Sequence, residues 1–402
     1  MPFGFNAPSS QGKSLKKVNK HSLVKRQGAL AGINVPVAVC AVALIAYGAL
    51  VIWTASLSMP DASFPRHLMG IGIGLVLAAI AWNVDYRMFA NMSTALLVLD
   101  LVLIFLPYVP FLSYHSLGLT GWIRIPFIRL TFQPVELAKI VTILFMSSLG
   151  AQYNGSIDSI REYVKLCAML FVPFAAVVIQ GDLGSSLVVF FSGAVIIMMS
   201  GAKKEWVLST LAIIVGLVAL MLAADSTLDR ILGHDVLIKQ YQMNRLLVFI
   251  DPAADTSDSG YNLQQSMIAV GSGGFFGKGI GNATQSADGF LYGAHTDFVF
   301  AFLCEEFGFL GAIVLLGLFA VLLVSTVRVA WKCESIFGRL VAVGIVAMWL
   351  FQILENVGMC IGLMPITGIP LPFISFGSSS MMMQIMNVGV VQSVWKHRAK
   401  AA

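Results

Sequence analysis

Residues 33–53 (INVPVAVCAVALIAYGALVIW) form a continuous apolar run without a charged side chain. A helix needs about 20 predominantly apolar residues to cross the hydrocarbon core of a bilayer, and this run is long enough to do so. It is longer than the apolar core of a signal peptide, so we interpret it as a retained first membrane span. Six basic residues precede it: Lys13, Lys16, Lys17, Lys20, Lys25 and Arg26.

The rest of the chain has the same character. Of its 402 residues, 58% are hydrophobic and only 11% are charged, and the mean hydropathy is +0.85. Soluble domains carry about a quarter charged residues, so this composition excludes a soluble enzyme and a disordered chain. The five cysteines show neither a disulfide framework nor the spacing of a zinc site. They are Cys40, Cys167, Cys304, Cys333 and Cys360.

The apolar runs predict an all-α polytopic membrane protein with ten transmembrane helices. Residues 1–32 would form a basic N-terminal tail, 33–396 a single membrane domain and 397–402 a C-terminal tail. The predicted spans are 33–56, 65–83, 89–111, 133–152, 163–180, 183–200, 205–224, 296–327, 337–363 and 370–395.

The distribution of basic residues predicts the orientation. An even number of spans places both termini on one side, and most of the 25 Lys and Arg residues lie near span ends on that side. Basic flanks are retained in the cytoplasm, so we predict that both termini are cytoplasmic. We interpret the basic tails as membrane flanks and predict no nucleic-acid partner.

This orientation places the one long loop, residues 225–295 between spans seven and eight, outside the cytoplasm. A structureless loop of this length is uncommon unless it has a function. Residues 262–270 (NLQQSMIAV) predict a short amphipathic helix, and 271–281 (GSGGFFGKGIG) predict a backbone that turns tightly or approaches another segment closely. The glycine run is not a phosphate-binding P-loop, because Ser272 and Gly279 stand where that motif needs Gly and Ser or Thr.

Ionisable residues within spans are candidate functional residues because burying them is expensive. Glu136 and Lys139 are three residues apart on the fourth span and share a helix face. They form either a structural ion pair or a direct contact with substrate. Asp182, in the short connection between spans five and six, is either a helix cap or a cavity residue.

Asp297 begins the eighth span where the long loop re-enters the membrane. Position alone allows a capping role or a catalytic one, since a carboxylate at the mouth of a partly desolvated cleft suits a general base. Glu305 lies deeper on the same helix, and His295 is interpreted as a surface or capping residue. The residues Gln352, Glu355 and Asn356 predict a hydrogen-bonded packing face on the ninth span.

Residues 358–380 (GMCIGLMPITGIPLPFISFGSSS) interrupt the helical pattern with three prolines among glycines. A non-helical backbone at membrane depth must line a cavity or be covered by protein. We therefore expect this segment to form a cavity wall, with Ser378 among the cavity residues.

Several strings, taken in order, resemble one family. They are 133–139 (QPVELAK), 181–184 (GDLG), Asp251-Pro252, Gly260-Tyr261, Gln265-Ser266, 271–279, 295–298 (HTDF), 305–308 (EEFG) and 370–373 (PLPF). Together they resemble the SEDS proteins (RodA/FtsW/SpoVE) from about residue 33 onward. Residues 284–286 (TQS) and Glu136-Leu137 look more like the RodA elongation branch than the FtsW division branch.

The resemblance implies a peptidoglycan glycosyltransferase that polymerises lipid II at the outer face of the membrane during elongation and shape maintenance. Asp297 matches the family's essential acidic residue, here proposed as a general base, and Glu136 and Lys139 match its cavity charges. The leaving pyrophosphate needs positive charge, for which we favour Arg245 and Lys278. A divalent cation, Mg or Mn, is a further candidate, although the sequence shows no dedicated ligand set.

The resemblance also implies partners, namely a class B penicillin-binding protein acting as transpeptidase and other elongation-complex membrane proteins. Three alternatives remain open. The same bundle would suit a lipid II flippase, with Glu136, Lys139 and Asp182 lining the path. The chain would otherwise be a division-type (FtsW) polymerase, or a scaffold that activates a transpeptidase.

Overall fold

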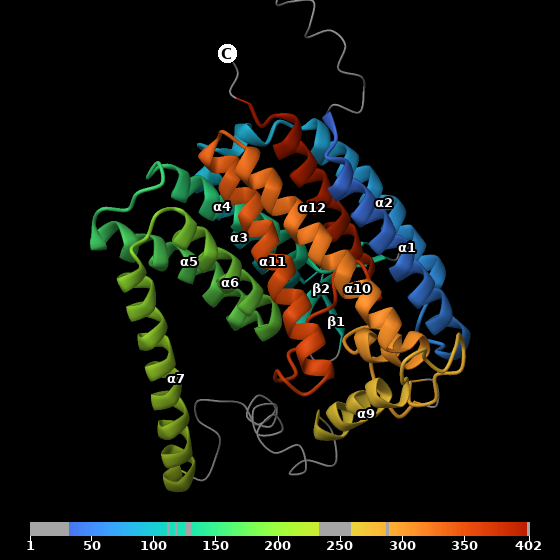
Figure 1. Cartoon of the computed structure of the whole chain (residues 1–402). Coiled ribbons are helices and arrows are strands. Elements are labelled where there is room, and N and C mark those ends of the chain that lie inside the picture. Colours follow the sequence, from blue (N-terminus) through green and yellow to red (C-terminus); the bar gives the residue numbers. More distant parts are fainter. Residues whose placement is uncertain are drawn as a thin grey trace, which may run out of the picture.

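The computed structural model describes residues 32–110, 113–116, 119–125, 130–232, 259–286 and 289–399. In this part of the chain, each predicted span overlaps one α-helix (Figure 1). The helices are α1 (Val35–Ser58), α2 (Phe64–Asn83), α3 (Ser93–Phe105), α4 (Pro134–Ala151), α5 (Ile160–Gln180), α6 (Leu183–Met199), α7 (Lys204–Leu232), α10 (Val299–Lys332), α11 (Ile336–Cys360) and α12 (Ser378–Lys396). Shorter helices are η3 (Tyr86–Phe89), η4 (Leu106–Tyr108) and α9 (Ser259–Ser272), the last confirming the predicted amphipathic helix.

The all-α polytopic class is confirmed. Among the described residues, α1, α2, α4, α5, α10 and α11 are long and apolar enough to cross a membrane, and α6 and the segment Ser93–Tyr108 are shorter apolar helices. The largest boundary differences from the prediction are at the end of α7 and the start of α12. Helix α7 continues to Leu232, and α12 begins only at Ser378, because Pro370 and Pro372 cannot lie inside a helix. The ten-span topology stays a prediction.

A small antiparallel sheet precedes α4, and the sequence analysis did not predict it. Its strands β1 (Ser113–Ser116), β2 (Leu119–Ile125) and β3 (Leu130–Phe132) are ordered β1-β2-β3. In the register, Tyr114 pairs with Trp122 and Arg124 with Thr131. The Ser379 hydroxyl donates to the Thr131 carbonyl at 3.3 Å, which ties β3 to the start of α12.

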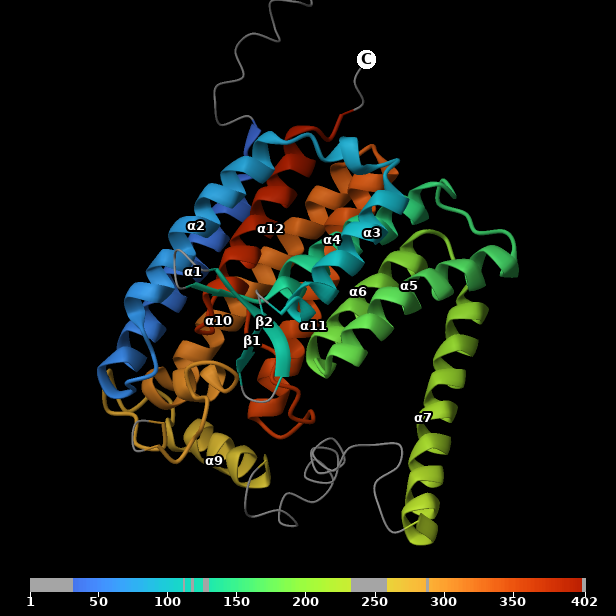
Figure 2. The same cartoon turned by 180° about the vertical axis from the view of Figure 1, so that it is seen from behind.

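Glycines bring α2 and α12 into close contact, and both views show the two helices side by side (Figures 1 and 2). A Cβ at Gly70 would lie 3.0 Å from the Ser378 Cα, and one at Gly389 would lie 2.3 Å from the Ala78 carbonyl oxygen. Small residues allow such close backbone approach between membrane helices, where no hydrophobic force drives association. Gly70 and Gly389 therefore serve the packing of α2 against α12.

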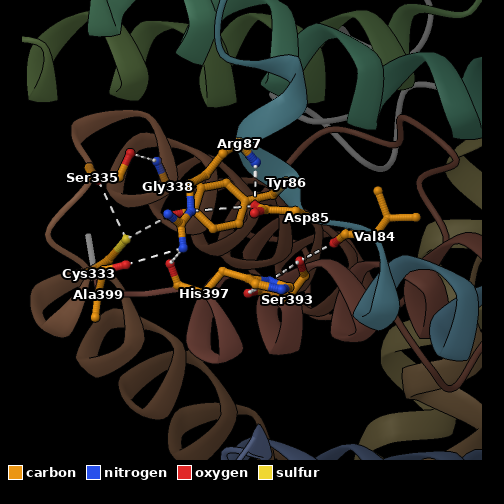
Figure 3. Close-up of polar contacts among 10 residues, drawn as sticks. All are labelled: Val84, Asp85, Tyr86, Arg87, Cys333, Ser335, Gly338, Ser393, His397 and Ala399. Atoms are coloured by element: carbon orange, nitrogen blue, oxygen red, sulfur yellow. Dashed lines mark hydrogen bonds and ion pairs between the residues drawn. The ribbon is translucent and has the colours of Figure 1, made fainter. Parts of the chain in front are cut away.

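The end of α12 is fastened to the connection between α2 and α3 (Figure 3). The Arg87 guanidinium donates to the carbonyl oxygens of His397, at 2.7 Å, and Ala399, at 3.2 Å, and the Ser393 hydroxyl donates to the Val84 carbonyl. The start of α1 lies at this same end of the molecule (Figure 1). Both ends of the described chain are therefore on one side of the bundle.

Helix α10 is broken at Gly308, where φ is +66°, and the glycine run inserts into the break. The N–H groups of Phe309 and Leu310 donate to the carbonyls of Gly274 and Phe275 instead of to the preceding turn. The carbonyls thereby freed, those of Glu305 and Glu306, accept from residues 278 and 279 at 2.9 and 3.1 Å. The broken helix thus loses no backbone partner.

This insertion confirms that the glycine run approaches another segment closely. A Cβ at Gly273 would lie 1.9 Å from the Cys304 carbonyl oxygen, and one at Gly277 would lie 2.1 Å from that of Glu306. Side chains at either position would separate the loop from α10.

Helix α7 stands apart from the bundle in both views (Figures 1 and 2). It contacts α5 near its start, where the hydroxyls of Tyr163 and Thr210 lie 2.8 Å apart and Tyr163 packs against Trp206. Among the side chains that the structure describes on α7, apolar ones are exposed on different faces of the helix, including Leu208, Leu211, Ile213, Val215 and Leu217. A helix with this pattern is suited to lipid contact.

Candidate active site

Asp297 lies in the turn that precedes α10, and three successive carbonyls fasten this turn to the connection between α11 and α12. The His295 carbonyl accepts from the Phe376 N–H at 2.8 Å, and the Thr296 carbonyl accepts from the Ser375 hydroxyl at 2.6 Å. The Asp297 carbonyl accepts from Asn356 Nδ2 at 2.7 Å. The backbone that carries the Asp297 carboxylate is therefore held at every residue of the motif.

The connection itself is shaped to accept this carboxylate. Gly368 has φ +77°, and a Cβ there would lie 3.2 Å from Asp297 Oδ2. Asn356 Nδ2 also donates to the Ile369 carbonyl at 2.8 Å, and the Thr367 hydroxyl donates to Glu355 Oε1. The predicted polar face of the ninth span is confirmed, and it orders the segment over which Asp297 lies.

The paired charges on α4 are confirmed. Lys139 Nζ lies 2.7 Å from Glu136 Oε1, and both side chains are almost fully buried, at 2% and 3% exposure. Glu136 Oε2 is buried without a hydrogen-bond partner. An ion pair buried this deeply gains little stability over apolar residues of the same size, because desolvation offsets the attraction.

Asp182 caps α6, which is one of the two roles considered for it, because its Oδ1 accepts from the Ser185 N–H at 2.9 Å. Its other oxygen accepts from Gln133 Nε2 at 3.0 Å, and the Gln133 N–H donates to the Ser379 hydroxyl at 3.1 Å. These bonds bring together the first turns of α4, α6 and α12. Three positive helix-dipole ends meet there, an arrangement that favours negative charge.

The segment 367–369 lies between this meeting point and the Asp297 turn. A Cβ at Gly184 on α6 would lie 2.9 Å from Ile369 Cγ1 and 3.1 Å from the Thr367 carbonyl oxygen. Between these two residues, Gly368 lies beside the Asp297 carboxylate, since a Cβ there would be 3.2 Å from Oδ2. The structure therefore places Asp182 and Asp297 on elements that pack against one short stretch of backbone.

Glu305 and Lys278 contact each other. Lys278 Nζ donates to Glu305 Oε1 at 2.7 Å and to the Thr284 hydroxyl at the same distance. The fully buried Glu305 carboxylate also accepts the N–H groups of Thr284, Gln285 and Ser286 at 2.8, 2.9 and 3.3 Å. These contacts hold the loop on α10.

We expect Glu305→Ala to lower the free energy of unfolding by about 3–5 kcal/mol, because it leaves three N–H groups and the partly buried Lys278 ammonium without their acceptor. Thermal unfolding in detergent would measure the loss, and limited proteolysis would show whether residues 278–286 become cleavable. Glu205→Ala removes an exposed carboxylate and serves as the control. Equal stability of the two variants would contradict the anchoring role.

The remaining predicted residues lie as follows. Ser378 is the first residue of α12 and faces Gly70 of α2. Arg245 lies outside the described residues. His295 is half-buried, and burial lowers its pKa while the carboxylate of Asp61 partly opposes the shift, so the imidazole is neutral at pH 7.

A metal site does not form from the described residues alone, because no three His, Cys, Asp or Glu side chains gather there. Mg²⁺ commonly binds one or two carboxylates together with substrate phosphates. At such a site, Asp297 would supply a single carboxylate ligand.

Several residues of the site were missed by the sequence analysis. Ser375 and Gly368 contact the Asp297 turn from far along the chain, and Gln133 joins α4 to Asp182. Outside the site, the sequence analysis also missed Asp100, which is fully buried on α3 and accepts from the Thr142 hydroxyl at 2.6 Å. A signal was present only for Asp100, as a single acidic residue within an apolar run.

Comparison with known proteins decides the family. The model of the family described as "Cell cycle protein" (FtsW/RodA/SpoVE) matches residues 35–400. The chain belongs to the SEDS family.

Two curated SEDS relatives are similar over almost their whole length. The "Peptidoglycan glycosyltransferase MrdB" of Escherichia coli (strain K12) is 33% identical over 89% of this chain and 91% of its own. The "Probable peptidoglycan glycosyltransferase FtsW" of Geobacter sp. (strain M18) is 32% identical over 90% of this chain and 96% of its own. Because these identities are almost equal, they do not resolve the predicted RodA branch.

A solved structure shows the same fold. A chain from "Structural coordination of polymerization and crosslinking by a peptidoglycan synthase complex" superposes with a TM-score of 0.72 at 28% identity, covering 91% of this chain and 98% of that one. The SEDS fold thus extends over nearly all of the present chain.

Proposed function

We propose that this SEDS protein is a peptidoglycan glycosyltransferase that polymerises lipid II at the outer face of the cytoplasmic membrane, with Asp297 as the general base. Its relatives carry the name of this activity. The observation that supports the residue assignment is the fastening of the Asp297 turn by Phe376, Ser375 and Asn356. A base acts efficiently only when its position is fixed relative to the hydroxyl it deprotonates.

The proposed reaction is a single displacement. The 4-hydroxyl of the acceptor sugar attacks the anomeric carbon of a donor linked through pyrophosphate to a lipid, and the product has the inverted configuration. Asp297 takes the hydroxyl proton as the new bond forms. The bond to pyrophosphate breaks, and the leaving group carries away the electron pair.

Negative charge on the leaving pyrophosphate needs stabilisation. The converging first turns of α4, α6 and α12, with Lys139 buried on α4, support a role of this region in binding the pyrophosphate. Of the two cations first considered, Lys278 is engaged by Glu305, so we assign it to the loop and keep Arg245 as the candidate for the leaving group. The lipid tail would lie against exposed apolar helix surfaces such as that of α7.

We further propose that both termini are cytoplasmic, that the protein acts in elongation as a RodA-type enzyme, and that its partner is a class B penicillin-binding protein. The position of α1 and α12 at one end of the bundle supports the first point. The similar chain from a peptidoglycan synthase complex supports the last. The motifs at 284–286 and 136–137 support the branch.

The decisive experiment supplies lipid II to the purified chain with its transpeptidase. Glycan polymer on a gel supports the proposal. Movement of labelled lipid II between the leaflets of a vesicle without polymer would favour the flippase instead, because the buried charges suit either function.

Gly368→Ala tests the position of the base. The added methyl group meets Asp297 Oδ2 and strains a positive φ, so we expect polymerisation to fall about tenfold to a hundredfold while the free energy of unfolding drops by only about 1–2 kcal/mol. Gly362→Ala is the matched control, since its φ is +75° and its Cβ would meet the flexible Met267 side chain. Equal polymerisation by the two variants would show that Gly368 does not position the base.

A further inference from the structure

A cavity of about 330 Å³ lies at the opposite end of α10 from Asp297. It is an open cavity bordered by the start of α1, the last turns of α10 and the end of α12, and its lining includes Arg328, Lys332 and Trp395. The proposed topology places this end in the cytoplasmic leaflet, and the inference rests on that topology. None of the reaction steps described above uses this cavity.

The charge of the cavity is positive. Arg328 and Lys332 are four residues apart and share one face of α10, where they lie on successive turns. The cavity lining contains no acidic residue, and no ion pair among the described residues includes either cation. Two neighbouring cations without a carboxylate favour an anionic ligand.

A second observation indicates a ligand with acceptor oxygens. The Trp395 Nε1 atom is buried and has no hydrogen-bond partner. Buried indole N–H groups normally find an acceptor, so this donor is available to an oxygen inside the cavity. Lys332 Nζ also lies over the Trp395 ring, 5.5 Å from its centroid, and this cation–π contact holds the ammonium beside the indole.

The wall formed by α1 is held in place. Gln392 of α12 accepts the Asn34 N–H at 2.7 Å and donates to the Asn34 carbonyl at 3.0 Å. The Asn34 side chain in turn caps α1 through the Val37 N–H at 3.2 Å. The cavity is thus bounded by a fixed backbone rather than by a loop.

Apolar side chains continue from the cavity into the membrane. Val35, Val39 and Val42 are exposed along one face of α1, and Val321 and Val324 are exposed on the neighbouring α10. A cationic pocket below an apolar strip matches a phosphate headgroup with acyl chains above it. Basic pockets between helices on the cytoplasmic side bind such lipids.

We propose that this cavity binds the phosphate headgroup of an anionic phospholipid of the inner leaflet. Arg328 and Lys332 contact the phosphate oxygens, and the Trp395 N–H donates to an oxygen of the headgroup. The acyl chains lie along the valine strip of α1 and α10.

Native mass spectrometry of the full-length protein tests this proposal. Phosphatidylglycerol and phosphatidylcholine with identical acyl chains are titrated separately. We expect the wild-type protein to bind phosphatidylglycerol at least about tenfold more tightly, and the double variant Arg328→Gln/Lys332→Gln to lose this preference. The double variant Lys203→Gln/Lys204→Gln is the matched control, because it removes two neighbouring cations, one of them beside Trp206, outside the cavity. It should keep the preference.

Three further measurements distinguish the alternatives. Thermal unfolding without lipid should be the same for Arg328→Gln/Lys332→Gln and for the wild-type protein. Equal unfolding temperatures would show that a lost lipid preference comes from lost binding and not from misfolding. If millimolar inorganic phosphate displaces phosphatidylglycerol, the cavity is a site for free phosphate and the lipid proposal is overturned.

Trp395→Phe should weaken the binding of phosphatidylglycerol severalfold. Undiminished binding would show that the Trp395 N–H does not contact the headgroup. Persistence of the preference in Arg328→Gln/Lys332→Gln would overturn the whole proposal.

Discussion

Asp297→Asn is expected to reduce lipid II polymerisation by at least about a hundredfold, because general bases contribute about 10²–10⁴ in rate. Asparagine keeps the size of the side chain and leaves the carbonyl that accepts from Asn356 unchanged. The variant should therefore fold normally and bind the transpeptidase. Polymer formed from labelled lipid II over time, compared at equal protein concentration, measures the effect.

The control for this variant is Asp61→Asn. Asp61 is an exposed carboxylate in the connection between α1 and α2, on the same proposed side of the membrane as Asp297. Its loss removes one negative charge from that face without removing the proposed base, so polymerisation should stay near the wild-type rate. If Asp297→Asn also polymerises at that rate, Asp297 is not the base. A loss of polymer together with a lower unfolding temperature would instead indicate damage to the turn.

The helices were predictable because backbone N–H and C=O groups in a bilayer must be hydrogen-bonded within the protein. An apolar run long enough to cross the bilayer therefore forms a helix. The prediction of secondary structure failed where contacts between distant segments, and not the local sequence pattern, determine the backbone conformation. The break in α10 lies within a strongly apolar run, and Gly308 is stable there only because the glycine run supplies its hydrogen bonds. The sheet β1–β3 is too short to produce a strong alternating pattern.

The site was predictable in part, for a related reason. Lys139 and Glu136 are one helical turn apart, so their pairing follows from helix geometry alone. Asp182 is a cap, which is also a local feature. The pairing of Lys278 with Glu305 and the anchoring of the Asp297 turn by Ser375 join residues distant in sequence. Such contacts depend on how the helices pack, which no local pattern determines.

The second large effect concerns the buried pair on α4. Lys139→Met leaves the Glu136 carboxylate buried without its ammonium, and we expect a loss of about 3–5 kcal/mol in the free energy of unfolding. The double variant Glu136→Leu/Lys139→Met removes both charges and should regain most of that stability. Thermal unfolding of Glu136→Leu, Lys139→Met and the double variant measures the coupling between the two charges. A double variant no more stable than Lys139→Met would contradict this expectation.

Polymerisation by the same double variant separates the two roles left open for the pair. Because an apolar pair would stabilise the bundle equally well, stability does not explain why two charges are buried beside the first turns of α6 and α12. A negatively charged substrate group would explain Lys139, with Glu136 as the counter-ion of its ammonium until substrate binds. On this hypothesis we expect the folded double variant to stay inactive. Asp100→Leu/Thr142→Val is the matched control, since it removes a buried polar pair between α3 and α4 and should leave polymerisation largely intact. Near wild-type polymer from Glu136→Leu/Lys139→Met would assign the pair to structure alone.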